Sequence, residues 1–189
     1  MGIFFELMKH LLFILIALAI FAFSARAQTG FDSSRLSGDG RKAYQTLLAA
    51  TQFTIGPAGY AGYSKEETAL RTLLKENAGE EACANLVIDA NHEGGLYGLL
   101  GLRFIKSDMF ARHLQKYQLR PLPPERILAG VRVPQGKIVT MEGCFIFRVE
   151  LTELLSQLEA GAFDKEFELD GKPSTITAMP NKALQLTAR

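Results

Sequence analysis

Residues 91–105 have the sequence Asn-His-Glu-Gly-Gly-Leu-Tyr-Gly-Leu-Leu-Gly-Leu-Arg-Phe-Ile, the most apolar run outside the N-terminus. The glycines at 95, 98 and 101 fall along one ridge of a helix, and leucines cover most of its remaining surface. A helix that is apolar nearly all round is typical of the centre of a domain. Because Gly98 and Gly101 each cost about 1 kcal/mol relative to alanine in a helix interior, the ridge predicts that another backbone packs closely against it.

Helical periodicity and capping signals on both sides of this run predict further helices. Asp39 is expected to cap a first helix, and Ser64-Lys-Glu-Glu67 forms a capping box for a second. Glu80 and Glu81 suit the first turn of a third helix, and Ser107-Asp108 is expected to cap the helix that follows the central one. Residues 65–117 are therefore expected to form two consecutive helical hairpins with short connections.

The character of the chain changes after the prolines at 121–124. Residues 126–133 and 137–149 are rich in Val, Ile and Phe, and the Val-Pro-Gln-Gly between them is a turn signal, which predicts one β-hairpin. Gly143 interrupts the second run and is expected to mark a bulge or bend. The alternative is an irregular segment with one short strand. A last helix with a leucine stripe follows, and Gly161 is expected to end it.

The expected fold class is mainly α (α+β), with stacked helical hairpins around a central glycine-ridged helix and a small β-hairpin near the C-terminal third. The expected organisation is a signal peptide over residues 1–27, a flexible leader over 28–40, a single globular domain over 41–168 and a disordered tail over 169–189.

The N-terminus has the sequence features of an export signal in the expected order. Lys9 and His10 precede an apolar run from Leu11 to Phe23, and Ala25-Arg26-Ala27 supplies a cleavage site. The run is shorter than the ~20 residues that a membrane-spanning helix needs, which favours cleavage after Ala27 over an uncleaved anchor. We therefore expect a periplasmic or secreted protein with no stable membrane anchor. This pattern is cleaner if Met8 is the true start, because Met8-Lys9-His10 then lies directly before the apolar run, so Met1 and Met8 are both candidate starts.

The net charge limits the kinds of binding partner that we expect, and the two cysteines raise the question of a disulfide. The net charge of +1 at pH 7 gives no electrostatic reason to expect nucleic acid as a partner. Export places Cys83 and Cys144 in an oxidising compartment, where one disulfide is expected if they meet in the fold. The alternative is two buried free thiols, because cysteine is among the most buried residue types.

No complete catalytic or metal-binding motif is present in the sequence. His92-Glu93 is followed by two glycines, so the H-E-x-x-H zinc pattern is absent, and Ser64 suits a helix cap better than a nucleophile. The glycines at 94–101 follow an expected helix rather than a strand, which argues against a phosphate-binding loop. No metal or cofactor is expected.

One weak polar cluster is a candidate ligand site. His92 and Glu93 lie at the expected N-terminal end of the central helix, Tyr97 lies one turn further in, and Tyr60 and Tyr63 lie on a glycine-rich loop. If that loop folds over the helix start, these side chains form a small pocket whose amide donors favour an anionic group. The alternative is that they cap, pack and face solvent separately.

Arg103 stands alone on an otherwise apolar helix. Such a residue either extends its guanidinium to water or pairs with an acid. A structural ion pair is the expected role, and a ligand clamp is the alternative.

Two resemblances concern origin rather than activity. The pattern Gly-Leu-Tyr-Gly-Leu-Leu-Gly-Leu-Arg at 95–103, with its upstream Gly-Tyr-Ala-Gly loop and downstream Gly143-Cys144, resembles a family of uncharacterised exported bacterial proteins with no assigned activity. The resemblance covers about residues 44–160. The tail 180–189, Pro-Asn-Lys-Ala-Leu-Gln-Leu-Thr-Ala-Arg, resembles reading-frame ends from mobile gene cassettes (integrons) and is left out of the fold reasoning.

These observations favour an exported, non-enzymatic domain that binds an unknown protein or small ligand in the cell envelope. The competing class is a small periplasmic hydrolase that uses His92 and Glu93 as acid–base groups. A pocket that unites these two residues with Tyr60 or Tyr63 would favour the hydrolase, whereas an exposed apolar patch without such a pocket would favour the binding domain.

Overall fold

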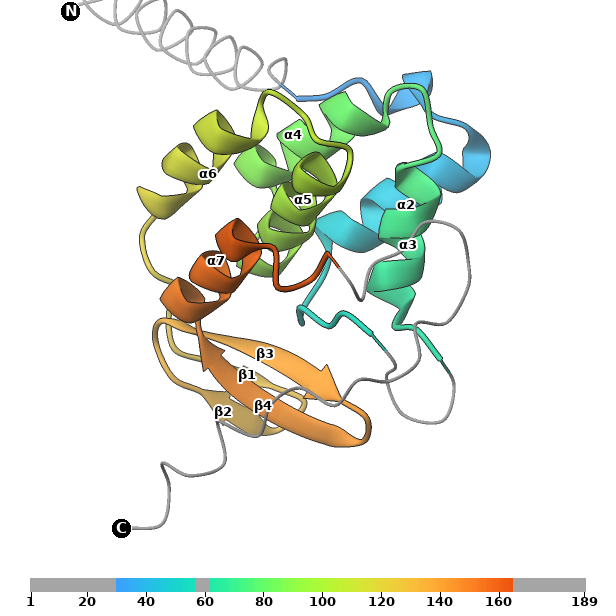
Figure 1. Ribbon diagram of the computed structural model, residues 1–189. Coiled ribbons are helices and arrows are strands. Elements are labelled where there is room, and N and C mark those ends of the chain that lie inside the picture. Colours follow the sequence, from blue (N-terminus) through green and yellow to red (C-terminus); the bar gives the residue numbers. More distant parts are fainter. Residues whose placement is uncertain (1–29, 57–61, 165–189) are drawn as a thin grey trace, which may run out of the picture. The chain divides into compact units, whose positions relative to one another are not determined.

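The computed structural model describes residues 30–56 and 62–164, so the expected signal peptide and tail lie outside the described residues. The account concerns the unit that begins at Ser33. Figure 1 shows its elements in chain order: a short 3-10 helix η2 (Ser33–Arg35), α2 (Gly38–Leu48), α3 (Lys65–Leu73), α4 (Gly79–Asp89), α5 (His92–Phe104), α6 (Phe110–Gln118), β1 (Arg126–Leu128), β2 (Val131–Val133), β3 (Lys137–Glu142), β4 (Phe145–Glu150) and α7 (Leu151–Ala160). The mainly helical fold with late β structure is confirmed.

Helix α5 is the central element, as its composition predicts. It contacts α2, α3, α4, α6 and α7, and every residue from Glu93 to Leu102 is buried. Asn91 caps it by accepting a hydrogen bond from the backbone N–H of Gly94 at 2.9 Å. The Asn91 amide also donates to the carbonyl oxygen of Ala50 at 2.5 Å, which joins the start of α5 to the segment that follows α2.

The glycine ridge brings α5 against α4, as predicted. A Cβ atom built at Gly98 would lie 2.6 Å from the backbone carbonyl oxygen of Cys83, and one at Gly101 would lie 2.5 Å from the Cys83 sulfur. Real Cβ atoms do not approach this closely, so any side chain here would force the two helices apart. Gly95 allows a close contact with a different helix, because a Cβ atom at this position would meet the ring of Tyr117 on α6.

The pairing of the helices differs from the expected one. The most extensive helix contacts join α2 to α3 and α4 to α5, so the hairpins are offset by one helix from the two predicted within residues 65–117. The physical reason is the glycine ridge, which gives α5 its closest approach to the helix before it rather than to the helix after it.

Ordered structure begins earlier than the leader predicted over residues 28–40. Leu36 is only 3% exposed, and Ser37 rather than Asp39 caps α2, accepting from the N–H of Gly40 at 3.0 Å. The Arg35 guanidinium also forms a bidentate ion pair with Glu81 on α4. The buried Leu36 side chain and the Arg35–Glu81 ion pair hold this segment against the helices. Neither contact can be predicted from the polar composition of the segment.

The single expected β-hairpin is two hairpins. β1 pairs antiparallel with β2 through a turn at Ala129 and Gly130, which both have positive φ, and β3 pairs with β4 through Gly143-Cys144. Gly143, with φ of +56°, therefore forms the tight turn itself rather than a bulge. Each apolar run of the sequence folds back on itself because its central residues adopt the backbone that a two-residue hairpin turn requires.

The ends of the other helices follow the predictions in part. Ser64 caps α3 by accepting from the N–H of Glu67 at 3.0 Å, and Gly161, with φ of +77°, ends α7. Ser107 does not cap α6, because that helix begins at Phe110. Its hydroxyl instead accepts from the N–H of Met109 at 3.1 Å in the preceding turn.

Both cysteines are free thiols, so the disulfide alternative is wrong. Cys83 is fully buried between α4 and α5, whereas Cys144 is exposed in the β3–β4 turn, so the expectation of two buried thiols holds for Cys83 alone. Burial raises the pKa of the Cys83 thiol to about 12, with the Glu80 carboxylate acting in the same direction. Cys83 therefore behaves as a small apolar core residue.

Candidate functional site

His92 lies at the start of α5, where it meets Tyr117 from α6. The Tyr117 hydroxyl donates to the His92 carbonyl oxygen at 2.6 Å and lies 3.3 Å from the imidazole Nδ1. Burial lowers the pKa of His92 to about 4, and the positive charges of Arg120 and Arg126 act in the same direction. The imidazole is therefore neutral at physiological pH and is a weak base.

Glu93 is buried and pairs with Arg126, the first residue of β1. Its side chain is 2% exposed, and burial raises its pKa more than the Arg126 charge lowers it. The Arg126 Nε atom is buried and, within the described residues, has no hydrogen-bond partner. The pair therefore connects the start of the central helix to the β structure rather than presenting a carboxylate to solvent.

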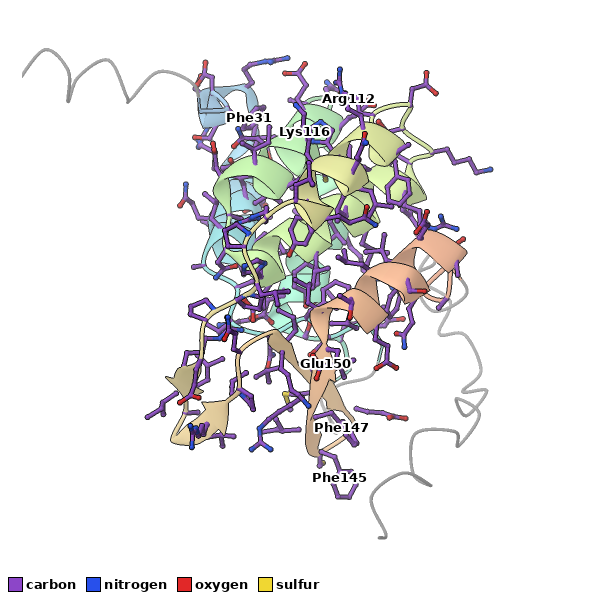
Figure 2. The ribbon with its side chains drawn as sticks, turned by 90° about the vertical axis from the view of Figure 1, so that its left-hand side faces the viewer. Phe31, Arg112, Lys116, Phe145, Phe147 and Glu150 are labelled. Carbon is purple, nitrogen blue, oxygen red and sulfur yellow. The ribbon has the colours of Figure 1, made fainter. Side chains whose placement is uncertain are left out.

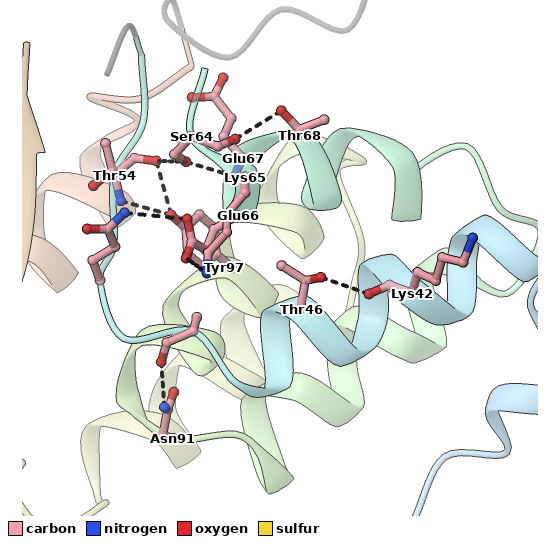
Figure 3. Close-up of polar contacts among 12 residues, drawn as sticks. Lys42, Thr46, Thr54, Ser64, Lys65, Glu66, Glu67, Thr68, Asn91 and Tyr97 are labelled. Atoms are coloured by element: carbon pink, nitrogen blue, oxygen red, sulfur yellow. Dashed lines mark hydrogen bonds and ion pairs between the residues drawn. The ribbon is translucent and has the colours of Figure 1, made fainter. Parts of the chain in front are cut away.

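Tyr97 holds the segment that follows α2. Its hydroxyl accepts from the backbone N–H of Thr54 at 2.9 Å and donates to the Thr54 carbonyl oxygen at 3.1 Å. The Thr54 hydroxyl in turn accepts from the N–H of Met141 on β3 at 3.1 Å. Figure 3 shows Tyr97 and Thr54 in this network, which links α5 to the sheet through one buried tyrosine.

Tyr63 lies away from these residues and is 37% exposed. The Arg71 guanidinium lies over its ring, with the central carbon 4.4 Å from the ring centroid. Tyr60 lies outside the described residues. The loop that was expected to bring both tyrosines over the start of α5 therefore places Tyr63 beside α3.

Two buried carboxylates at the start of α3 were not predicted as part of a site. Glu67 is fully buried, accepts from the N–H of Gly56 at 2.7 Å and pairs with Arg71 at 2.7 Å, while burial raises its pKa. Glu66 is 1% exposed, with the Gln52 amide 3.5 Å away and the Lys65 ammonium 3.7 Å away. Figure 3 shows this cluster around the capping Ser64. The only sequence signal was the capping box, which places the carboxylates on the helix but not inside the protein.

Arg103 forms the expected ion pair. Its Nε and one Nη atom each contact an oxygen of Asp164 at 3.0 Å, and the other Nη donates to the carbonyl oxygen of Glu159 at 2.9 Å. These bonds tie the end of α5 to the end of α7. The guanidinium has a structural role here, and the ligand-clamp alternative gains no support.

The candidate ligand residues thus have separate partners. Each of the four described members of the proposed pocket contacts a different residue: His92 contacts Tyr117, Glu93 contacts Arg126, Tyr97 contacts Thr54 and Tyr63 contacts Arg71. The structure does not bring them around one cavity. Within the described ranges, no three His, Cys, Asp or Glu side chains are grouped to hold a metal ion.

A shallow cavity of about 290 Å³ lies between the end of α6 and α7. It is lined by Tyr117, Gln118, Arg120, Leu122, Leu151, Thr152, Leu155, Ser156 and Glu159. Arg120, its most polar wall, already donates to the carbonyl oxygens of Val87 and Ala90. The cavity is at the small end of the range for ligand pockets.

Three consecutive large apolar side chains are exposed on β4. Phe145 is 72% exposed, Ile146 is 54% exposed and Phe147 is 43% exposed, and we call these three residues the hairpin surface. Figure 2 shows both phenylalanine side chains at the end of the hairpin away from the helices. Alternation along a strand places Phe145 and Phe147 on one face and Ile146 on the other, so the hairpin end is apolar on both faces.

Adjacent residues of a strand point to opposite faces, yet both Val139 and Ile138 on β3 are buried, at 8% and 0% exposed. The far end of β4 extends beyond the helices that cover the base of the hairpin, so alternation no longer separates an inside from an outside. No pattern within the strand marks where that cover ends.

Comparisons with protein-family models, with curated proteins and with solved structures gave no match. Among the described residues, none of the helices combines the length and apolar character that a membrane crossing needs.

Proposed function

We propose that this chain is an exported, non-enzymatic domain that binds a protein partner in the cell envelope through the hairpin surface. The observation that carries the proposal is the run of three consecutive exposed apolar residues, Phe145 to Phe147, on one strand. Single exposed apolar side chains are common on protein surfaces, but contiguous ones at the end of a projecting element mark interaction sites. The expected signal peptide at residues 1–27 supports a location in the cell envelope.

The contacts of the polar residues also support a binding role over catalysis. A general base must reach a substrate with its proton-accepting atom, and a pKa near the operating pH makes it efficient. The pKa of His92 is lowered to about 4, and Glu93 is enclosed by Arg126. No observation in the described residues favours the hydrolase alternative.

The proposal is tested by comparing captured proteins between two surface variants. The double variant Phe145→Ser with Phe147→Ser removes most of the hairpin surface, while Ile88→Ser removes an apolar residue of α4 that is 56% exposed. Full-length chains recovered from the envelope of an expressing bacterium serve as baits in native envelope extract. We expect wild type and Ile88→Ser to retain the same partner, and the double variant to lose it at least tenfold.

Two results would contradict the proposal. One is equal capture by the double variant and wild type. The other is hydrolytic activity toward an ester or peptide panel that disappears in His92→Ala, since this would assign the chain to the competing class.

A further inference from the structure

Strand β4 is paired along one of its two edges. Its residues match those of β3 one for one, so no bulge interrupts the pairing. The outer edge of β3 is covered, because the N–H of Phe53 donates to the carbonyl oxygen of Val139 at 2.8 Å. Within residues 30–56 and 62–164, no backbone hydrogen bond reaches the outer edge of β4 at Ile146 or Arg148.

The hydrogen-bond register identifies the backbone groups on that outer edge. The N–H of Leu151 donates to the carbonyl oxygen of Gly136 at 2.9 Å, so these opposite residues form a bonded pair. Bonded and non-bonded pairs alternate along antiparallel strands, which makes Ile146 and Arg148 non-bonded residues of β4. Val139, which lies opposite Arg148, turns its carbonyl group to the covered edge of β3, as this assignment requires. Ile146 and Arg148 therefore direct their N–H and C=O groups away from β3.

The side chains along β4 divide between its two faces. Phe145, Phe147 and Val149 lie on one face, and Ile146 and Arg148 lie on the other. One face of the edge is therefore apolar, and the other carries a positive charge next to an exposed isoleucine. A row of outward backbone groups beside such side chains is the arrangement that accepts an additional strand.

Arg148 is the charge on this edge that a partner can neutralise. Its side chain is exposed, and within the described residues no ion pair or hydrogen bond involves its guanidinium. The other charges near the hairpins are compensated by the chain itself, because Lys137 pairs with Glu150 at 3.2 Å and Arg132 pairs with Glu125 at 2.9 Å. Opposite charges directly across two strands are stabilising, so an added strand is favoured when it places an acidic residue opposite Arg148.

We propose that this edge binds an extended segment of the protein partner, added antiparallel to β4, with an acidic residue opposite Arg148 and apolar residues on both sides of it. The inference rests on the proposed function and names the chemistry of its partner. The acidic residue forms a bonded pair with Arg148, so its carboxylate lies on the same face as the guanidinium. Its two apolar neighbours lie opposite Phe147 and Val149, and a third apolar residue lies opposite Phe145.

A second copy of β4 does not supply this chemistry. Its own acidic residue, Glu150, would lie opposite Arg148 only if Leu151 also paired as a strand, but α7 begins at Leu151. A single six-residue strand also buries less than the ~1,200 Å² of stable interfaces. We therefore expect weak, reversible binding of a short segment, in which backbone bonds supply affinity and the side chains supply specificity.

Defined peptides test the expected partner chemistry. The probe has the sequence Thr-Val-Glu-Val-Thr-Val, with an N-terminal fluorescein and a C-terminal amide, and its glutamate is designed to lie opposite Arg148. Binding to the full chain is measured by fluorescence anisotropy. We expect saturable binding of this peptide, and about tenfold weaker binding when lysine replaces its glutamate, because like charges then face each other.

A charge exchange at Arg148 tests the predicted pairing. Arg148→Glu should bind the lysine peptide about tenfold more tightly than the glutamate peptide, since opposite charges meet again in the exchanged pair. Arg112→Glu is the matched control, because it makes the same change at an exposed arginine of α6, far from the phenylalanines of the hairpin in Figure 2. This control should keep the wild-type preference. Circular dichroism checks that both variants fold.

Methylation of the peptide backbone separates strand addition from contact between side chains alone. A methyl group on the glutamate nitrogen removes the N–H that donates to the Arg148 carbonyl oxygen, and it should weaken binding about tenfold or more. A methyl group on the nitrogen of the next valine, opposite Phe147, should leave the affinity within about twofold. That N–H belongs to a non-bonded pair and points away from β4.

Several results would overturn the inference. These are equal affinity for the glutamate and lysine peptides, an unchanged preference in Arg148→Glu, and equal effects of the two methyl groups. Absence of binding to the full chain at millimolar peptide would also overturn it, since the edge would then be closed by the chain itself. A mass in sedimentation equilibrium that doubles with concentration and is unaffected by the peptide would assign the edge to a second copy.

The outcomes also separate this inference from the proposed function. If the peptides fail but the double serine variant still loses the envelope partner, the proposed function stands with a partner that binds in another way. Equal capture of envelope protein by the double serine variant and wild type would instead remove the proposed function, whatever the peptides do.

Discussion

Helix α5 and strand β4 are both rich in large apolar side chains, between Leu96 and Leu102 in the helix and from Phe145 to Phe147 in the strand. The leucines of α5 are 0% exposed, because neighbouring helices surround it. The phenylalanines of β4 are 72% and 43% exposed, because the strand extends beyond the elements that cover its base. Equal hydrophobicity therefore produces a core in one region and a candidate interface in the other, and the number of neighbours decides which.

The comparison predicts a large loss of stability when α5 is pushed from α4. Gly98→Ala places a methyl group 2.6 Å from a backbone oxygen and 3.0 Å from two side chains of α4, which cannot all move aside. We expect the free energy of unfolding, measured by urea titration, to fall by about 3 kcal/mol.

Gly38→Ala is the matched control, because it adds the same methyl group to a helix with nothing within 4 Å. It should raise stability by about 0.5 kcal/mol through the higher helix propensity of alanine. Equal stability of the two alanine variants would mean that α4 and α5 are not in close backbone contact.

A smaller loss of stability is expected when the contact between the helical core and the β3–β4 hairpin is weakened. Tyr97→Phe leaves the N–H and C=O groups of Thr54 without their buried partner, at a cost of about 2 kcal/mol. Hydrogen exchange at the amides of Thr54 and Met141 should accelerate, since the Thr54 segment covers the β3 edge. Tyr63→Phe, at a half-exposed ring, should change stability by less than about 0.5 kcal/mol. Unchanged exchange in Tyr97→Phe would show that other contacts hold the segment.

The buried Glu93 predicts a dependence on pH. Its pKa in the folded protein is raised above 4.5, so the folded state binds the proton more tightly than the unfolded state. This contribution to stability is present below the unfolded pKa and is lost as the pH rises through the folded value. Glu93→Gln should therefore reduce the decline in unfolding free energy over that window, and Glu67, whose pKa is raised in the same direction, should account for part of what remains.

Glu125 provides the control for that pH profile. It is exposed, and its hydrogen bond to Arg132 lowers its pKa, so its contribution has the opposite sign. Glu125→Gln should leave the decline in place or make it slightly steeper. If Glu93→Gln does not alter the decline in unfolding free energy with pH, titration of groups other than Glu93 causes that decline.

The smallest effect on stability is expected at the hairpin surface itself. Phe145→Ser with Phe147→Ser removes side chains that are largely exposed, so the free energy of unfolding should change by less than about 0.5 kcal/mol while capture of the envelope partner is lost. A loss of several kcal/mol would show instead that the two rings are buried against the rest of the chain, and would remove the contrast with α5.

The predictions succeed where local chemistry is sufficient. The glycine spacing at 98 and 101 indicated a close helix contact, Ser64 indicated a helix start, and Gly161 indicated a helix end. Each of these depends on a few neighbouring residues, whose backbone conformation or packing needs are the same in any fold. The ion pair expected at Arg103 belongs to the same class, since a charge on an apolar helix requires a partner wherever it lies.

The predictions fail where the partner comes from a distant part of the chain. Glu93 was expected at a pocket mouth, but Arg126 reaches it from β1, and Tyr97 was expected in that pocket, but it bonds Thr54. The burial of Glu66 and Glu67 depends on the chain near Gly56 folding over α3. These partners are between 11 and 43 residues apart, and no periodicity in the sequence predicts such contacts.

By itself the sequence determined the mainly helical class, the central position of α5, the cap at Ser64 and the helix end at Gly161, because these follow from local backbone preference and from the apolar fraction of a surface. Only the tertiary structure decided that the polar candidates take separate partners and that Phe145, Ile146 and Phe147 on β4 are exposed. Whether an apolar side chain is buried depends on the elements packed around it, and these are set by the path of the whole chain.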